Sequence, residues 1–110
     1  MRQFSSWLMI LLLMATVINY PNPFNPKGGQ VTTLACTTDL TTEATLYIYN
    51  LAARLQLVRS FNLSGGRANL ITWNGYNDYN EMVGNGIYPY QIINRAKTRI
   101  ARGKIWVVNH

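Results

Sequence analysis

Tyr20-Pro21-Asn22-Pro23-Phe24-Asn25-Pro26 is the stretch that restricts the fold most, because three of its seven residues are prolines. Proline has a fixed φ and no backbone N–H, so the stretch cannot lie in a helix or a central strand, and we expect an extended lead-in. Its distant counterpart is Trp73-Asn74-Gly75 followed by Gly86-Ile87-Tyr88-Pro89-Tyr90, which is typical of a strand end, a long polar loop and a strand opened by glycine. Together the two stretches predict a small all-β module displayed outside the cell.

The rest of the chain shows the two-residue alternation of half-buried strands. In the clearest case one face carries Ala44, Leu46 and Ile48, and the other carries Thr45, Tyr47 and Tyr49. The predicted strands are Val31–Thr38, Glu43–Tyr49, Arg54–Phe61, Arg67–Trp73, Ile87–Asn94 and Thr98–Val108, the last interrupted near Gly103. Short turns and the lack of helical periodicity after Ile18 predict an antiparallel β-sandwich of six or seven strands.

Length and composition restrict the function. A chain of 110 residues forms one domain with a modest core. The net charge of +6 suits nucleic acid or an anionic membrane surface, but no aromatic-rich basic motif accompanies it. We therefore interpret the cations as a solvated face and expect no nucleic-acid partner. Cys36 is the only cysteine, which excludes an intrachain disulfide, and we expect it to be a small buried hydrophobe.

The N-terminus has a different composition, with one positive charge before an apolar run. This layout indicates a secretory signal, although Leu13 stands where cleavage favours a small residue. The alternative is a retained apolar helix, which is too short to span a bilayer unaided and would need burial in lipid or between subunits. We divide the chain into an apolar segment, residues 1–18, and a sandwich, residues 19–110. The side chains available for assembly are those of Trp7, Leu8, Ile10, Leu11, Leu12, Leu13, Val17 and Ile18.

The motifs resemble the Ig-like C-terminal modules that serve as sorting signals for type IX secretion, and the related Ig-like domain of flagellar hook-capping proteins. Those families begin with YPNPFNP, followed by a Thr-Thr strand, an IYN turn, a W-D-G-x-D loop and a G-x-Y-x-Y strand. The matching residues here are Tyr20, Pro21, Asn22, Pro23, Phe24, Tyr49, Asn50, Trp73, Gly75, Gly86, Tyr88 and Tyr90. The resemblance covers Asn19 to about Val108 and implies an Ig-like fold.

Four positions depart from the family pattern. Asn74 and Asn77 replace aspartates, which removes carboxylates from the loop. Ala53 and Asn80 replace glycines, and asparagine adopts a left-handed backbone more easily than alanine does. If the first turn keeps its shape, Ala53 costs about 1 kcal/mol.

The chain offers little for catalysis or metal binding. Asn77, Asp78, Asn80 and Glu81 place oxygen atoms close together, but two carboxylates are few for calcium, and such residues commonly form turns. His110 is the only histidine and lies at the chain terminus, without a partner for base catalysis. We expect no catalytic residues, no metal site, no cofactor and no enzymatic activity. The aromatic residues Tyr47, Tyr49, Trp73, Tyr88, Tyr90 and Trp106 could form a binding platform, but we expect half of them to pack in the core.

Two functions fit these observations. The resemblance implies a module for secretion sorting or cell-surface anchoring, which secretion machinery recognises as a folded domain. The alternative is a self-assembling, filament-like structural subunit that uses the retained N-terminal segment and open sheet edges. In both cases we expect a bacterial, extracytoplasmic protein, secreted or at the cell surface. Its partners would be secretion machinery or copies of itself, and the membrane would be touched only through the N-terminal segment.

Overall fold

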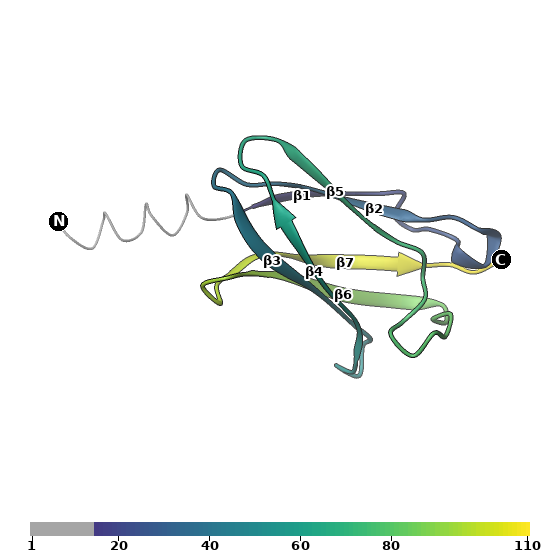
Figure 1. Ribbon diagram of the computed structural model, residues 1–110. Coiled ribbons are helices and arrows are strands. Elements are labelled where there is room, and N and C mark those ends of the chain that lie inside the picture. Colours follow the sequence, from purple (N-terminus) through teal and green to yellow (C-terminus); the bar gives the residue numbers. More distant parts are fainter. Residues whose placement is uncertain (1–14) are drawn as a thin grey trace.

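The computed structural model describes residues 15–110, which form an antiparallel β-sandwich (Figure 1). One sheet has the strand order β1-β2-β5 and the other β4-β3-β6-β7. The elements are β1 (Thr16–Tyr20), the short 3-10 helix η1 (Pro26–Gly28), β2 (Thr32–Thr37), β3 (Thr42–Tyr49), β4 (Leu55–Leu63), β5 (Ala68–Trp73), β6 (Gly86–Asn94) and β7 (Arg99–Val107). The predicted fold class is confirmed. Among residues 15–110 there is no helix whose length and hydropathy would let it span a membrane.

The core lies between the two sheets and follows the predicted alternation. In β3, Ala44, Leu46 and Ile48 are buried, whereas the residues between them are only half-buried. In β6 the buried side chains are those of Tyr88, Tyr90 and Ile92. Cys36 is fully buried as expected, and its burial raises the pKa of the thiol.

A seventh strand, β1, precedes the lead-in and corrects the predicted boundary at residue 18. Val17 and Ile18 were expected in an apolar segment, but they pair with Cys36 and Ala35 of β2. Val17 packs against the core, whereas Ile18 faces outward and is 64% exposed. The sandwich therefore begins by Thr16. The other predicted assembly residues, Trp7, Leu8, Ile10, Leu11, Leu12 and Leu13, lie outside the described residues.

The predicted interruption of the last strand at Gly103 is wrong. Gly103 pairs regularly with Tyr90. The register shifts at Ile100 instead, because its neighbours Arg99 and Ala101 pair with Ile93 and Ile92, which are consecutive in β6. Gly103 is needed for a different reason, because a Cβ there would collide with the Tyr90 ring. The fourth strand is also longer than predicted and ends at the buried Leu63.

The turn between β3 and β4 keeps its shape without glycine. Ala53 has a φ of 62° and Asn80, in the later loop, a φ of 61°, so both residues adopt the left-handed backbone that the family pattern implies. Asn50 holds the first turn, because its backbone N–H donates to the Arg54 carbonyl and its Oδ1 accepts from the Arg54 N–H, both at 2.9 Å.

Replacing Ala53 with glycine should stabilise the protein. Ala53→Gly relieves the left-handed strain and should raise the free energy of unfolding by about 0.5–1 kcal/mol, net of the greater freedom of the unfolded chain. Ala52→Gly is the matched control, because Ala52 has no positive φ, and it should lower stability slightly. Chemical denaturation measures both. Equal effects at the two positions would contradict the role of the backbone angle.

Candidate functional site

After β1 the lead-in, residues 21–24, runs along the outer edge of β7 and covers it. The Asn22 side chain donates to the Lys104 carbonyl at 3.0 Å and accepts from the Trp106 N–H at 2.8 Å. The Phe24 backbone then donates to the Trp106 carbonyl and accepts from the Val108 N–H, each at 3.0 Å. The lead-in thus lies outside any central strand, as predicted, but it is not simply extended, because residues 21–23 form bends and Pro26 lies in the 3-10 helix η1. Proline is tolerated there because the first turn of a helix needs no backbone N–H from it.

The two halves of the motif meet in one aromatic cluster. The ring centroid of Trp73 lies 5.6 Å from that of Phe24 and 5.8 Å from that of Tyr88. All three side chains are buried. The indole N–H of Trp73 donates to the Tyr76 carbonyl at 2.9 Å, and the Tyr88 hydroxyl donates to the Gly84 carbonyl at 2.8 Å. The polar atoms of both rings are thus satisfied within the loop that joins β5 and β6.

Leu70 and Trp73 lie on opposite faces of β5. Leu70 is 64% exposed on the outer face of the sheet, whereas Trp73 is fully buried. The reason is strand parity, because Leu70 lies an odd number of residues from Trp73 and so faces the opposite side of β5. Ile71 occupies the inward position instead.

The glycines of the motif have unequal roles. Gly75 is buried with a φ of +85°, and a Cβ there would collide with the Pro26 ring. Gly86 has a φ of +151°, but nothing lies within 4 Å of its would-be Cβ. Gly66 also has a positive φ, of +76°, and nothing lies within 4 Å of its would-be Cβ. Gly86 is therefore not special compared with Gly66, and Gly75 is the position where both backbone and space require glycine.

The remaining motif residues are divided between surface and core. Tyr20 is 49% exposed on the outer face of β1, and Pro21 is exposed beside it. Pro23 is exposed next to the buried Phe24. Tyr49 is half-buried on the outer face of β3. Tyr90 is buried, and its burial raises the pKa of its phenol. Most of the motif therefore builds the scaffold, and a functional surface must be sought elsewhere.

Hydrogen bonds hold the polar loop after Trp73 in shape and attach it to β4. Asn77 Oδ1 accepts from the N–H groups of Tyr79 and Glu81, both at 3.0 Å. The Asp78 N–H donates to the Gln56 carbonyl at 2.8 Å, and the Asp78 carboxylate accepts from the Val58 N–H at 3.0 Å. Within residues 15–110 no three His, Cys, Asp or Glu side chains gather as metal ligands would.

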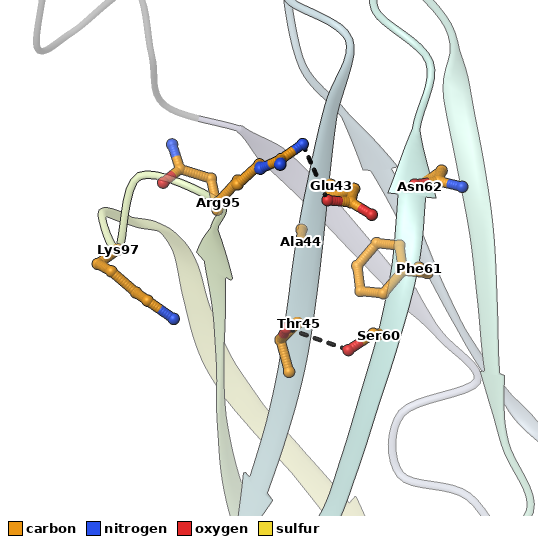
Figure 2. Close-up of a pocket in the computed structure, with 9 residues that line it drawn as sticks. Glu43, Ala44, Thr45, Ser60, Phe61, Asn62, Arg95 and Lys97 are labelled. Carbon is orange, nitrogen blue, oxygen red and sulfur yellow. Dashed lines mark hydrogen bonds and ion pairs between the residues drawn. The ribbon is translucent and has the colours of Figure 1, made fainter.

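A polar hollow of about 350 Å³ lies over β3 and β4 near the turn between β6 and β7, and Figure 2 shows the side chains that line it. Arg95 Nη1 reaches Glu43 Oε2 at 3.4 Å, and both side chains are largely exposed. The hydroxyls of Thr45 and Ser60 lie 3.4 Å apart and contact each other. An exposed ion pair of this kind contributes little to stability. Arg95 and Lys97 belong to the turn between β6 and β7, whereas Arg99 begins β7.

A second hollow, of about 510 Å³, combines cations with an aromatic side chain and is the strongest candidate for a binding surface. It lies against β6 and β7, and we call it the basic groove. Its lining residues are Tyr49, Pro89, Tyr90, Gln91, Arg99, Arg102, Gly103 and Lys104. Gln91 Nε2 donates to Tyr49 Oη at 2.9 Å and fixes that side of the groove. Three cations and no acid line it, which suits an anionic partner.

The aromatic residues divide as expected into a core half and a surface half. Trp73, Tyr88 and Tyr90 are buried. Tyr47 and Tyr49 stack on the outer face of β3 with ring centroids 6.5 Å apart. The periodicity did not reveal the groove, because its cations gather only when β6 and β7 pair, with Gln91 opposite Arg102 and Pro89 opposite Lys104.

No protein-family model matches the chain, and no curated protein does. Among solved structures, dimeric latent PorU from Porphyromonas gingivalis is similar over 87% of the chain, with a TM-score of 0.72 and 23% identity. PorZ, an essential bacterial surface component of the type-IX secretion system of the same organism, is similar over 84%, with a TM-score of 0.58 and 19% identity. The chain spans only 9% and 11% of those two structures. At these identities the similarity concerns the fold.

Removing the central ring of the cluster should unfold the domain. Trp73→Ala deletes a fully buried side chain and should cost about 3–5 kcal/mol, most of the stability of a small domain. Trp106→Ala is the control, because Trp106 is 50% exposed, and it should cost less than about 1 kcal/mol. Thermal unfolding followed by circular dichroism compares the two. A wild-type melting temperature for Trp73→Ala would contradict the central role of this ring.

Proposed function

We propose that this chain is a non-catalytic, Ig-like module of bacterial secretion, which protein partners at the cell surface recognise as a folded domain for sorting or anchoring. The observation that carries the proposal is the similarity to PorU over 87% of the chain with a TM-score of 0.72. The similarity to PorZ supports it, since PorZ is a surface component of a type-IX secretion system. The full match of Tyr20–Pro26 to the opening motif of the sorting modules points the same way.

The basic groove is the surface we assign to recognition. Tyr49 comes from β3, Gln91 from β6 and Lys104 from β7, so the groove exists only in the folded sandwich. A partner that reads this surface therefore distinguishes a folded module from an unfolded chain. No acid lines the groove: Glu43 pairs with Arg95, and Asp78 bonds to the edge of β4. The three groove cations can therefore attract an anionic patch of the partner. Screening by salt limits this attraction to a distance of about 8–10 Å.

The test is delivery of the full chain to the surface of a bacterium that has type IX secretion, measured by protease accessibility on intact cells. Delivery should be lost in a strain without the secretion machinery. The double variant Arg102→Glu/Lys104→Glu should reduce delivery at least tenfold. Its control is Arg54→Glu/Arg67→Glu, which changes two exposed residues outside the groove. Each Arg→Glu or Lys→Glu change lowers the charge by two, so both double variants lower the net charge from +6 to +2.

The control should leave delivery near the wild-type level. Equal delivery with and without the machinery would overturn the sorting function. Equal losses in the two double variants would instead show that total charge matters and the groove does not. Melting temperatures of both variants must match the wild type for the comparison to hold.

A further inference from the structure

The sandwich has four edge strands, and three of them are protected against pairing with another chain. An unprotected edge presents a row of free N–H and C=O groups that another strand can join. The outer edge of β7 is covered by Asn22 and Phe24. β1 lies beside β7, and the Ala15 N–H donates to the Ile100 carbonyl at 2.9 Å. The β1 and β7 edges therefore close one side of the sandwich.

The edge of β4 is protected by two charged residues. Asp78 occupies the hydrogen-bonding groups of Gln56 and Val58, as described above. Arg59 lies opposite the fully buried Leu46 and so occupies a core-facing position of β4. Its side chain is nevertheless exposed. A charge at an inward-facing position of an edge strand opposes the addition of another strand, because it would have to be buried.

The edge of β5 has none of these devices. Its sequence, Ala68-Asn69-Leu70-Ile71-Thr72-Trp73, contains no charge and no proline. All six residues pair with β2 without a register shift, so the strand is regular and has no bulge. Among residues 15–110, no backbone hydrogen bond other than those to β2 involves this strand. Leu70, 64% exposed, lies in one row with Ala35 and Ile18 on the uncharged outer face of the sheet.

We propose that β5 pairs antiparallel with β5 of a second copy of this chain, joining the two three-stranded sheets into one sheet of six strands. Antiparallel pairing of a strand with itself has twofold symmetry, so one uncharged edge satisfies both copies. The nearest charge on this part of the chain is Arg67, directly before β5. In a twofold antiparallel register centred on Leu70, Arg67 lies opposite Trp73 of the other copy and not opposite its own equivalent.

The charge distribution selects a second copy over an acidic partner. The chain carries +6, so two copies repel unless they meet where neither is charged. The β5 edge and the adjoining outer face meet this condition, since their outward residues are Thr16, Ile18, Tyr20, Thr33, Ala35, Thr37, Ala68, Leu70 and Thr72. An acidic partner has nothing to complement there and finds the basic groove instead.

The first test is disulfide crosslinking of the full chain. The native Cys36 is fully buried and provides the background. Single variants Ala68→Cys, Leu70→Cys and Thr72→Cys, oxidised alone and in pairwise mixtures, cover the registers that keep these residues on one face. We expect covalent dimers from at least one combination. Ile18→Cys on β1 and Val58→Cys on β4, both exposed, should give no more dimer than the wild type.

The second test separates edge pairing from stacking of the outer faces. Leu70→Lys and Ile18→Lys add the same charge to the same row at equally exposed positions, but only Leu70 lies on β5, whereas Ile18 lies on the opposite edge of the sheet. Sedimentation of the full chain should show at least tenfold weaker association for Leu70→Lys and wild-type association for Ile18→Lys. The absence of crosslinks from all three β5 cysteine variants and their mixtures, or equal weakening by the two lysines, would overturn the proposal.

Discussion

The backbone pairing of Phe24 with Trp106 and Val108 is the constraint on which the arrangement of the two sheets depends. β1 belongs to the three-stranded sheet and β7 to the four-stranded one, so the lead-in that follows β1 crosses from one sheet to the edge of the other. Its prolines prevent it from becoming a strand that pairs on both sides. Only Asn22 and Phe24 bond to β7, while the Phe24 ring turns inward onto Trp73. One side of the sandwich is thereby closed, and on the other side the edge of β5 remains open.

This arrangement separates scaffold from surface. Most of the motif residues that make the sequence recognisable form the Phe24–Trp73–Tyr88 cluster or hold turns. Residues buried in this way specify the fold and cannot contact a partner. What a partner meets are the two outer faces, which differ in chemistry. The four-stranded face carries the basic groove and the stacked Tyr47 and Tyr49, whereas the three-stranded face is uncharged.

The sequence predicted those features that depend on local pattern. Alternation identified six of the seven strands, and the left-handed backbone of Ala53 follows from the turn that glycine usually occupies. β1 was missed because its five residues continue an apolar run without a turn or proline, and only pairing with β2 distinguishes it. Gly103 was misread because a glycine within a strand can mark either a bulge or a close approach, and here it admits the Tyr90 ring.

Pro89 lies in β6, a central strand, but the pairing of β6 with β3 ends at Tyr90, so Pro89 has no partner on that side and its missing N–H breaks no ladder bond. The basic groove could not be predicted, because it depends on the register in which β6 and β7 pair.

The proposed pairing of β5 connects the two proposed surfaces. Pairing through β5 would place both four-stranded sheets on the same side of the joined sheet, so the two grooves would face the same way. Two weak anionic contacts on one partner surface then act together, because the second forms at the high effective concentration set by the first.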